Sequence, residues 1–225
     1  MEKKEKTIII LGDAIDKGYN VHDVINFLHR NLHKIKFVIG NHESYAYKYL
    51  KGKLKKNTSS QEVIETYFNS IKILENDEVL RNKFFEIYEN SLNFYVHKNF
   101  IATHAPCEKK YLGKIDSESL KKARNFRYPK RRDYGFLFDF IIEFDDKCAF
   151  MTKEANDAHP IHIFGHVMSK GVSRFKNKID IDSGCVAGGE LTSVVVNKYR
   201  KIAIETVAAG NKVKEHEYDL HKFFL

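Results

Sequence analysis

The sequence has few cysteines and no long apolar run, and each absence excludes a class of protein. Its three cysteines, Cys107, Cys148 and Cys185, are an odd number at wide spacing. This argues against a disulfide framework and a cysteine-rich zinc site, so we expect free thiols. No stretch approaches the roughly 18 to 20 apolar residues of a membrane span, and the charged first six residues lack the apolar core of a signal peptide. The sequence therefore predicts a cytoplasmic protein with no membrane partner.

Internal repeats and low-complexity linkers are also absent. The chain has 225 residues, of which 43% are hydrophobic and 30% charged. This length and composition are typical of one globular domain with a well-buried core. We therefore expect a single domain over residues 1–225.

Basic residues exceed acidic ones. There are 38 Lys and Arg against 30 Asp and Glu, which gives a formal net charge of +8. Such a charge attracts polyanions, although it is also common in lysine-rich proteomes, so nucleic acid is one candidate partner. The densest basic cluster, residues 124–132, interleaves Phe126 and Tyr128 with arginines. That pattern suits a phosphate or nucleic-acid surface, and it equally suits a solvated loop.

Two polar motifs each follow an apolar run. Gly12–Gly18 (GDAIDKG) follows residues 7–11, and Gly40–Glu43 (GNHE) follows residues 37–39. Runs of β-branched residues bounded by glycine are typical of buried strands, and open α/β sheets place their ligand sites at the carboxyl ends of strands. The carboxylates, the amide and the imidazole of these motifs are therefore expected to share one crevice.

Two histidines occur in the same setting further along, His104 after residues 100–103 and His166 after residues 161–165. Apolar periodicity predicts a helix over 21–32 and a helical segment over about 44–90 with a break at 57–60. The remaining strands are expected at 92–96, 100–104, 161–164, 179–181, 193–196 and 202–207.

Taken in order, these motifs and the segment 180–192 resemble the calcineurin-like metallophosphoesterases, on the side of the serine/threonine phosphatases and their bacterial and phage relatives. The resemblance covers residues 6 to 196. It implies an α/β fold, a β-sandwich of two mixed sheets flanked by helices, with residues 44–90 as the helical insertion. It also implies a metal-dependent phosphatase that hydrolyses phosphomonoesters, on a phosphoprotein or on a nucleotide or nucleic-acid end, by a metal-activated hydroxide.

The resemblance also assigns metal ligands. Asp13 matches the carboxylate that bridges two divalent metal ions, and Asn41, His104 and His166 match the other ligands of the second ion. A carboxylate can ligate two cations and offset their repulsion. This mixed oxygen and nitrogen set suits manganese first, and iron or zinc as alternatives.

The catalytic and phosphate-binding residues are assigned in the same way. His42 matches the histidine that protonates the leaving-group oxygen, and Asp16 the carboxylate that orients it. Lys17 stands where the family has a phosphate-gripping arginine, so it keeps the charge but not the planar bidentate fork. Arg127, or its neighbour Arg124, matches a second phosphate-gripping arginine.

One family motif has no counterpart, the Asp-x-His-Gly that ends the family's first strand and supplies ligands to the first metal. The only Asp-x-His triplet is Asp157–His159, which we interpret as a coincidental loop before the strand at 161–164. The fold is therefore expected without its first strand. Three interpretations remain: a shortened form of a longer protein, an enzyme of reduced activity with one metal in place of two, or a catalytically inactive phosphate- or nucleic-acid-binding pseudophosphatase.

The substrate is not decided by the motifs, because the family serves many phosphate esters on one scaffold. Symmetrical dinucleoside tetraphosphate hydrolases fit less well, since their second motif usually departs from the pattern that Asp13, Asp16 and Lys17 retain.

Overall fold

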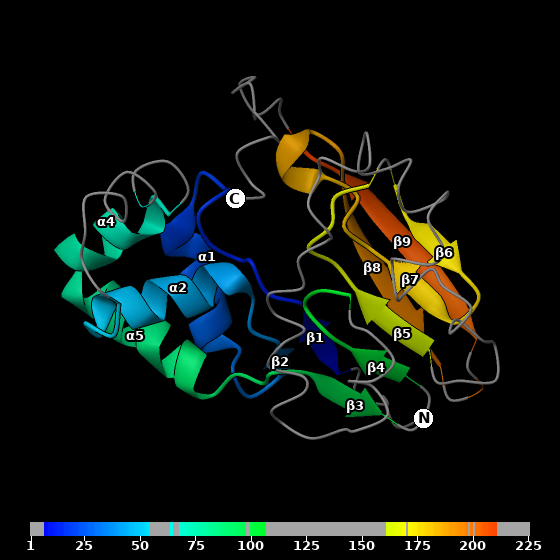
Figure 1. Ribbon diagram of the computed structural model, residues 1–225, viewed down its shortest axis with the longest axis horizontal. Coiled ribbons are helices and arrows are strands. Elements are labelled where there is room, and N and C mark those ends of the chain that lie inside the picture. Colours follow the sequence, from blue (N-terminus) through cyan, green and yellow to red (C-terminus); the bar gives the residue numbers. More distant parts are fainter. Residues whose placement is uncertain are drawn as a thin grey trace. The chain divides into compact units, whose positions relative to one another are not determined.

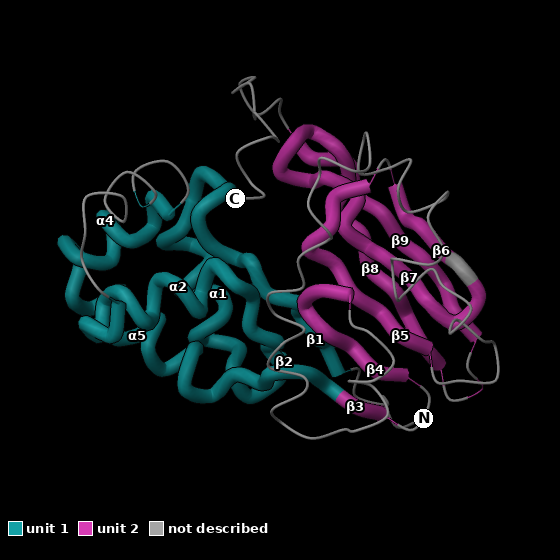
Figure 2. Tube along the Cα trace, viewed as in Figure 1, with its two compact units in different colours: residues 1–95 teal, residues 96–225 magenta. Residues whose placement is uncertain are grey.

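The structure is a computed structural model that describes residues 7–54, 64, 68–97, 100–106, 161–169, 171–197, 199 and 201–210. The chain divides into two compact units, residues 1–95 and residues 96–225, which Figure 2 shows in different colours. Each unit is described by itself. The expectation of one domain over residues 1–225 stays a prediction.

Unit 1 begins with a βαβ unit. Strand β1 (Ile8–Ile10) pairs in parallel with β2 (Ile35–Phe37), and helix α1 (Val21–Arg30) connects them. The helix begins where the Asn20 side chain accepts a hydrogen bond from the Asp23 amide, a typical N-cap. Its buried face carries Val21, Ile25 and Leu28, in agreement with the helical spacing of the sequence.

Three further helices complete the described part of unit 1, and Figure 1 shows them gathered beside α1. They are α2 (Asn41–Leu50), α4 (Ser70–Asn76) and α5 (Glu78–Glu89). Ile71, Leu74, Phe84 and Ile87 are almost completely buried and belong to the core that these helices share with α1. Burial of such side chains contributes about 1.5 to 3 kcal/mol each, so this core holds the helical segment in place.

The second strand lies two residues earlier than the sequence predicted. We expected residues 37–39, whereas β2 ends at Phe37; Val38 forms an isolated bridge with Leu92 and donates its amide to the Ile10 carbonyl. The Ile39 amide donates to the Leu92 carbonyl, and the chain then enters α2 at Asn41. The GNHE motif therefore lies at the start of a helix, directly after the sheet edge.

Unit 2 contains a five-stranded mixed sheet with the order β3-β4-β5-β7-β6. Its strands are β3 (Tyr95–His97), in which the boundary between the units falls, β4 (Phe100–Ala102), β5 (Ile161–Phe164), β6 (Ser173–Phe175) and β7 (Lys178–Asp180). Strands β4, β5 and β7 run parallel, and β6 is antiparallel to β7. All four residues of β5 are buried, as expected for a central parallel strand.

A short helical turn, η3 (Cys185–Ala187), leads to an antiparallel ribbon of β8 (Glu190–Val196) and β9 (Ile202–Ala208). The expected mixed α/β architecture is therefore present in the described residues. The strand at 161–164 agrees with the sequence prediction to the residue, and the boundaries of the other predicted strands differ from it by at most three residues. No helix in the described part of the chain has the length and apolar character that crossing a bilayer would require.

Candidate active site

The loop after β1 has an unusual backbone. Gly12, Asp13 and Asp16 have φ values of 79°, 52° and 79°, and positive φ is uncommon for residues other than glycine. Aspartate tolerates this region better than most residues because its short side chain hydrogen-bonds locally. The loop needs external support to hold both carboxylates in this conformation.

Glu43 supplies that support. Its carboxylate accepts hydrogen bonds from the amides of Asp13 (3.0 Å), Ala14 (2.7 Å) and Gly40 (3.0 Å). Glu43 is 2% exposed, and burial, followed by the negative charge of Asp13, raises its pKa to about 7 against the opposing effect of the amide donors. From the sequence, Glu43 has no predicted role of its own beyond its place in the GNHE motif. The signal that could have revealed its role is its place three residues after Gly40, which is the spacing of a capping box.

Asp13 lies against the start of α2. The His42 amide donates to Asp13 Oδ1 at 3.2 Å, so the carboxylate sits at the positive end of a ten-residue helix. The approach is close because Gly40 has no side chain: a Cβ there would collide with Asp13 and lie 2.8 Å from Glu43 Oε2. The structure therefore explains why glycine precedes Asn41.

The two predicted catalytic residues are in contact. His42 Nδ1 lies 2.7 Å from Asp16 Oδ2, and His42 Nε2 lies 3.9 Å from Asp13 Oδ2. His42 and Asp16 are almost fully buried, at 4% and 5% exposed. Burial lowers the pKa of His42, but the carboxylates of Asp13 and Asp16 outweigh that effect and the pKa is raised. The geometry is that of an imidazole whose Nδ1 proton is held by a carboxylate.

Asn41 and Lys17 flank this pair. Asn41 is the first residue of α2 and is half-buried. Lys17 directly follows Asp16, and its positive charge acts to lower the pKa of His42. The five predicted residues of unit 1 therefore share the carboxyl ends of β1 and β2.

The two histidines of unit 2 are also brought together. His104 follows β4 and His166 follows its neighbour β5, and His104 Nε2 lies 3.1 Å from His166 Nδ1. The Gly165 amide donates to the His104 carbonyl at 2.9 Å, which ties the two loops. Two nitrogens that bind one cation at about 2.1 Å in a tetrahedral arrangement lie about 3.4 Å apart. The spacing of the pair therefore fits two ligands of one metal ion.

A third histidine of this sheet has a different environment. His162 is 1% exposed, with Nε2 2.8 Å from Thr103 Oγ1 and Nδ1 3.2 Å from Lys178 Nζ. Burial, followed by the charge of Lys178, lowers its pKa well below 6.5. These contacts indicate a structural role for His162. On β7, Asp180 Oδ2 is buried and has no hydrogen-bond partner among the described residues, and burial raises the pKa of this carboxyl.

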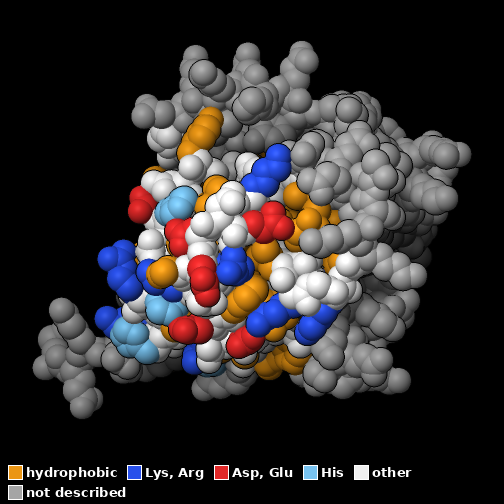
Figure 3. Space-filling view, turned by 90° about the vertical axis from the view of Figure 1, so that its left-hand side faces the viewer, with side chains coloured by type: hydrophobic (Ala, Val, Ile, Leu, Met, Phe, Trp, Pro, Cys, Tyr) orange, Lys and Arg blue, Asp and Glu red, His pale blue; other side chains and the backbone are white. Residues whose placement is uncertain are grey.

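Some predicted features lie outside the described residues, namely Arg124, Arg127, the basic cluster 124–132, Asp157–His159, Cys107 and Cys148. Figure 3 shows one face of the described part, where the helices of unit 1 lie. Basic and acidic side chains are interspersed on this face. The face in Figure 3 is therefore not a basic patch. In unit 1, Lys51 pairs with Glu89 (3.8 Å) and His29 with Glu86 (2.7 Å).

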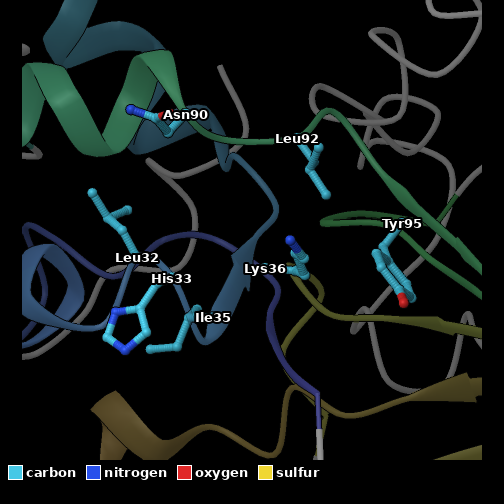
Figure 4. A pocket seen from close by; sticks show the side chains of 7 residues that line it. All are labelled: Leu32, His33, Ile35, Lys36, Asn90, Leu92 and Tyr95. Atoms are coloured by element: carbon cyan, nitrogen blue, oxygen red, sulfur yellow. The ribbon is translucent and has the colours of Figure 1, made fainter.

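A pocket of about 580 Å³ lies elsewhere in unit 1. Its lining includes Ile35 and Lys36 of β2, whereas Asn41 and His42 follow the carboxyl end of that strand. Figure 4 shows its lining residues, which are Leu32, His33, Ile35, Lys36, Asn90, Leu92 and Tyr95. The pocket contains none of the predicted site residues.

Comparison with known proteins gives a consistent result. The model of the family described as calcineurin-like phosphoesterase matches residues 1–188. The bis(5'-nucleosyl)-tetraphosphatase PrpE [asymmetrical] of Bacillus subtilis strain 168 is 25% identical over 243 residues, covering 99% of this chain and 86% of the relative. The protein of the same name from Bacillus velezensis is 22% identical over 223 residues, covering 92% and 80%.

Solved structures show the same fold. A mutant of a cold-active protein tyrosine phosphatase has a TM-score of 0.53 at 14% identity, covering 92% of this chain and 70% of that chain. The cold-active protein-tyrosine phosphatase of a psychrophile Shewanella species has a TM-score of 0.51 with the same identity and coverage. At this identity the likeness concerns the fold alone.

Proposed function

The chain belongs to the calcineurin-like phosphoesterases, and on this premise we propose that it is a metal-dependent phosphatase that hydrolyses nucleotide phosphates in the cytoplasm. One observation carries the proposal: the buried His42 imidazole is held by Asp16 at 2.7 Å beside the carboxylate of Asp13. A chain that only bound phosphate would not need a buried proton donor held in one orientation.

The family's ligand pattern gives the proposed cation ligands as Asp13, Asn41, His104 and His166. The 3.1 Å spacing of the two histidine nitrogens supports a common cation. Hard oxygens combined with imidazoles favour manganese, with iron and zinc as alternatives. A bound divalent cation supplies Lewis acidity and lowers the pKa of water. We propose one tightly held ion for these 225 residues, because only Asp13 matches the ligands of the family's first metal.

The residues of the chain itself have separate tasks. Lys17 attracts the phosphate by charge, without the bidentate geometry of arginine. His42 acts as the imidazolium: it gives its Nε2 proton to the oxygen of the leaving group as the bond between that oxygen and phosphorus breaks, and it remains as the neutral Nδ1–H form. The Asp16 carboxylate accepts a hydrogen bond from His42 Nδ1–H and so keeps Nε2 directed at the substrate.

The nucleotide assignment draws on the named relatives, which are asymmetrical bis(5'-nucleosyl)-tetraphosphatases. The assignment agrees with the pattern of Asp13, Asp16 and Lys17, which fits the symmetrical dinucleoside tetraphosphate hydrolases less well. Phosphoproteins and nucleic-acid ends are the other candidate substrates. The interspersed charges on the face in Figure 3 lend no support to a nucleic-acid surface there.

The test is manganese-stimulated hydrolysis of p-nitrophenyl phosphate and of diadenosine tetraphosphate by the 225-residue chain. We expect turnover, and we expect asymmetrical cleavage of the dinucleotide to ATP and AMP, resolved by chromatography. His42→Ala should lower kcat by about 100-fold or more, as loss of a general acid does. His29→Ala, on the exposed face of α1, is the matched control and should leave kcat unchanged.

Two outcomes would overturn the proposal. Absence of turnover in the wild type, together with retained phosphate binding by calorimetry, would identify an inactive phosphate-binding protein. Turnover that survives His42→Ala would show that the His42–Asp16 pair does not carry the reaction.

A further inference from the structure

Asp16 forms hydrogen bonds with two residues. One is His42, and the other is Ser70 of the helical segment. The Asp16 amide donates to Ser70 Oγ at 2.8 Å, and the Ser70 amide donates to Asp16 Oδ1 at 2.9 Å. These reciprocal hydrogen bonds join residues 54 positions apart in the sequence. They hold a residue whose φ of 79° is otherwise uncommon for aspartate.

This arrangement divides the two carboxylate oxygens of Asp16 between two partners. Oδ1 is used by Ser70, and Oδ2 faces His42 Nδ1. Rotation of the carboxylate would break both contacts at once. Ser70 is completely buried, so its hydrogen bonds with Asp16 are not in exchange with solvent.

The same segment also confines the imidazole. Phe68, two residues before Ser70, packs on His42 with ring centroids 5.0 Å apart. Tyr45, one turn after His42 on α2, stacks on Phe68 at 4.1 Å and 13°. The residues at the start of α4 therefore contact both members of the His42–Asp16 pair.

We propose that Ser70 is a positioning residue for the proton donor: its hydroxyl holds the Asp16 main chain and its amide holds Oδ1, so that Asp16 keeps the Nδ1–H of His42 and the Nε2 proton points at the leaving group. This inference rests on the proposed function, because it assumes that His42 protonates the leaving-group oxygen. Ser70 itself touches no reacting atom. Its effect on rate must therefore pass through Asp16 and His42.

The leaving group provides the first readout. Phenyl phosphate has a poor leaving group that needs a proton, whereas p-nitrophenyl phosphate has a better one that needs it less. Ser70→Ala removes the acceptor of the Asp16 amide, and we expect kcat on phenyl phosphate to fall about tenfold, the size of one buried hydrogen bond. The loss on p-nitrophenyl phosphate should be clearly smaller, with KM little changed. Ser44→Ala, a buried serine on α2 whose hydroxyl faces Tyr88, is the matched control and should leave this ratio unchanged.

A double-mutant cycle separates positioning from folding. In a His42→Ala background, Ser70→Ala should cause no further loss, because the residue through which it acts is gone. An equal loss in both backgrounds would overturn the proposal. Ser70→Thr keeps the hydroxyl and should retain the wild-type dependence on leaving group, so equal behaviour of Ser70→Thr and Ser70→Ala would also overturn it.

A readout independent of activity completes the test. Long-range proton–nitrogen NMR of the metal-free protein in alkaline buffer reports which ring nitrogen of His42 carries the proton. We expect the Nδ1–H form in the wild type and a mixture of tautomers in Ser70→Ala. If the wild type has no turnover but its tautomer depends on Ser70, the proposed function fails and the positioning role stands. If turnover occurs and neither the tautomer nor the leaving-group ratio changes in Ser70→Ala, the positioning role fails alone.

Discussion

Gly40 shows how closely two segments of unit 1 approach each other. Its φ of −91° suits any residue, so the requirement for glycine is purely steric. A Cβ at this position would lie 2.5 Å from the Asp13 amide nitrogen, a main-chain atom that cannot rotate away. The loop after β1 or the start of α2 would have to move.

We therefore predict that Gly40→Ala lowers the free energy of unfolding by about 1 to 3 kcal/mol, the usual cost of overpacking. Urea unfolding measures it. Gly18→Ala is the matched control, because no atom lies within 4 Å of the added Cβ. There the alanine should be neutral or stabilise by up to about 1 kcal/mol through the unfolded state. Equal effects of the two substitutions would contradict this account.

The candidate site was predictable at the residue scale only where the residues lie in motifs. Asp13, Asp16, His42, His104 and His166 lie within a few residues of the end of an apolar run, so local sequence places them at one kind of sheet edge. Ser70 was missed, because a lone serine 54 residues from its partner carries no local signal. Long-range hydrogen bonds of this kind become visible only after folding.

At the scale of elements, strand β5 carries a buried histidine, His162, within the sheet of unit 2. Since the pKa of His162 is lower in the folded chain than its ordinary value of 6.5, the unfolded chain binds the proton more tightly. Above about pH 6.5, His162 is neutral in both states and does not lower the free energy of unfolding. As the pH falls below 6.5, the free energy of unfolding decreases, because the unfolded chain takes up a proton at this position. Between pH 6.5 and 5.5 the loss should be about 1 kcal/mol.

Urea midpoints at pH 7.5 and 5.5 test this prediction. The wild type should lose more stability on acidification than His162→Gln, which cannot take up a proton at that position. Other titrating groups, including Asp180, are present in both proteins, so the difference isolates His162. His97→Gln, an exposed position on β3, should behave as the wild type. The same pH dependence in His162→Gln and wild type would refute the assignment.

The limits of an element were predictable where turn residues flank it on both sides. Pro160 and Gly165 enclose the apolar run of β5, and its limits were correct. The run at 37–39 has a glycine only at its end, and apolar character alone does not reveal where the hydrogen-bonded ladder stops. The prediction for β2 was therefore two residues late: Val38 keeps one hydrogen bond to the Ile10 carbonyl but bridges to Leu92, and Ile39 donates to Leu92.

At the scale of the whole molecule, the proposed ligand set predicts that a metal ion stabilises the chain. A ligand that binds only the folded state adds about 2.7 kcal/mol at 100 times its dissociation constant. After dialysis against a chelator, added manganese should therefore raise the unfolding midpoint. Elemental analysis should find one tightly held ion per chain.

His104→Ala should abolish most of this gain, and His97→Ala, on the exposed part of β3, should keep it. Two ions retained after dialysis would contradict the single-site proposal. A midpoint that does not respond to manganese, iron or zinc would contradict the proposed ligand set.

Composition and motifs predicted the family and the mixed α/β class, because five motifs in order constrain the whole chain. They could not predict the division into units of residues 1–95 and 96–225, since no linker composition marks the boundary near Tyr95. That boundary falls inside a strand, where the sequence continues without turn residues.

The reciprocal bonds between Asp16 and Ser70 also bear on the order of folding. The βαβ unit of β1, α1 and β2 closes over short sequence distances, whereas the Asp16–Ser70 contact closes a loop of 54 positions. Longer loops cost more entropy to close, so contacts of this kind tend to form later. Catalytic competence should accordingly appear after the secondary structure of unit 1 during refolding, so that an early intermediate has its helices in place while its proton donor is not yet aligned.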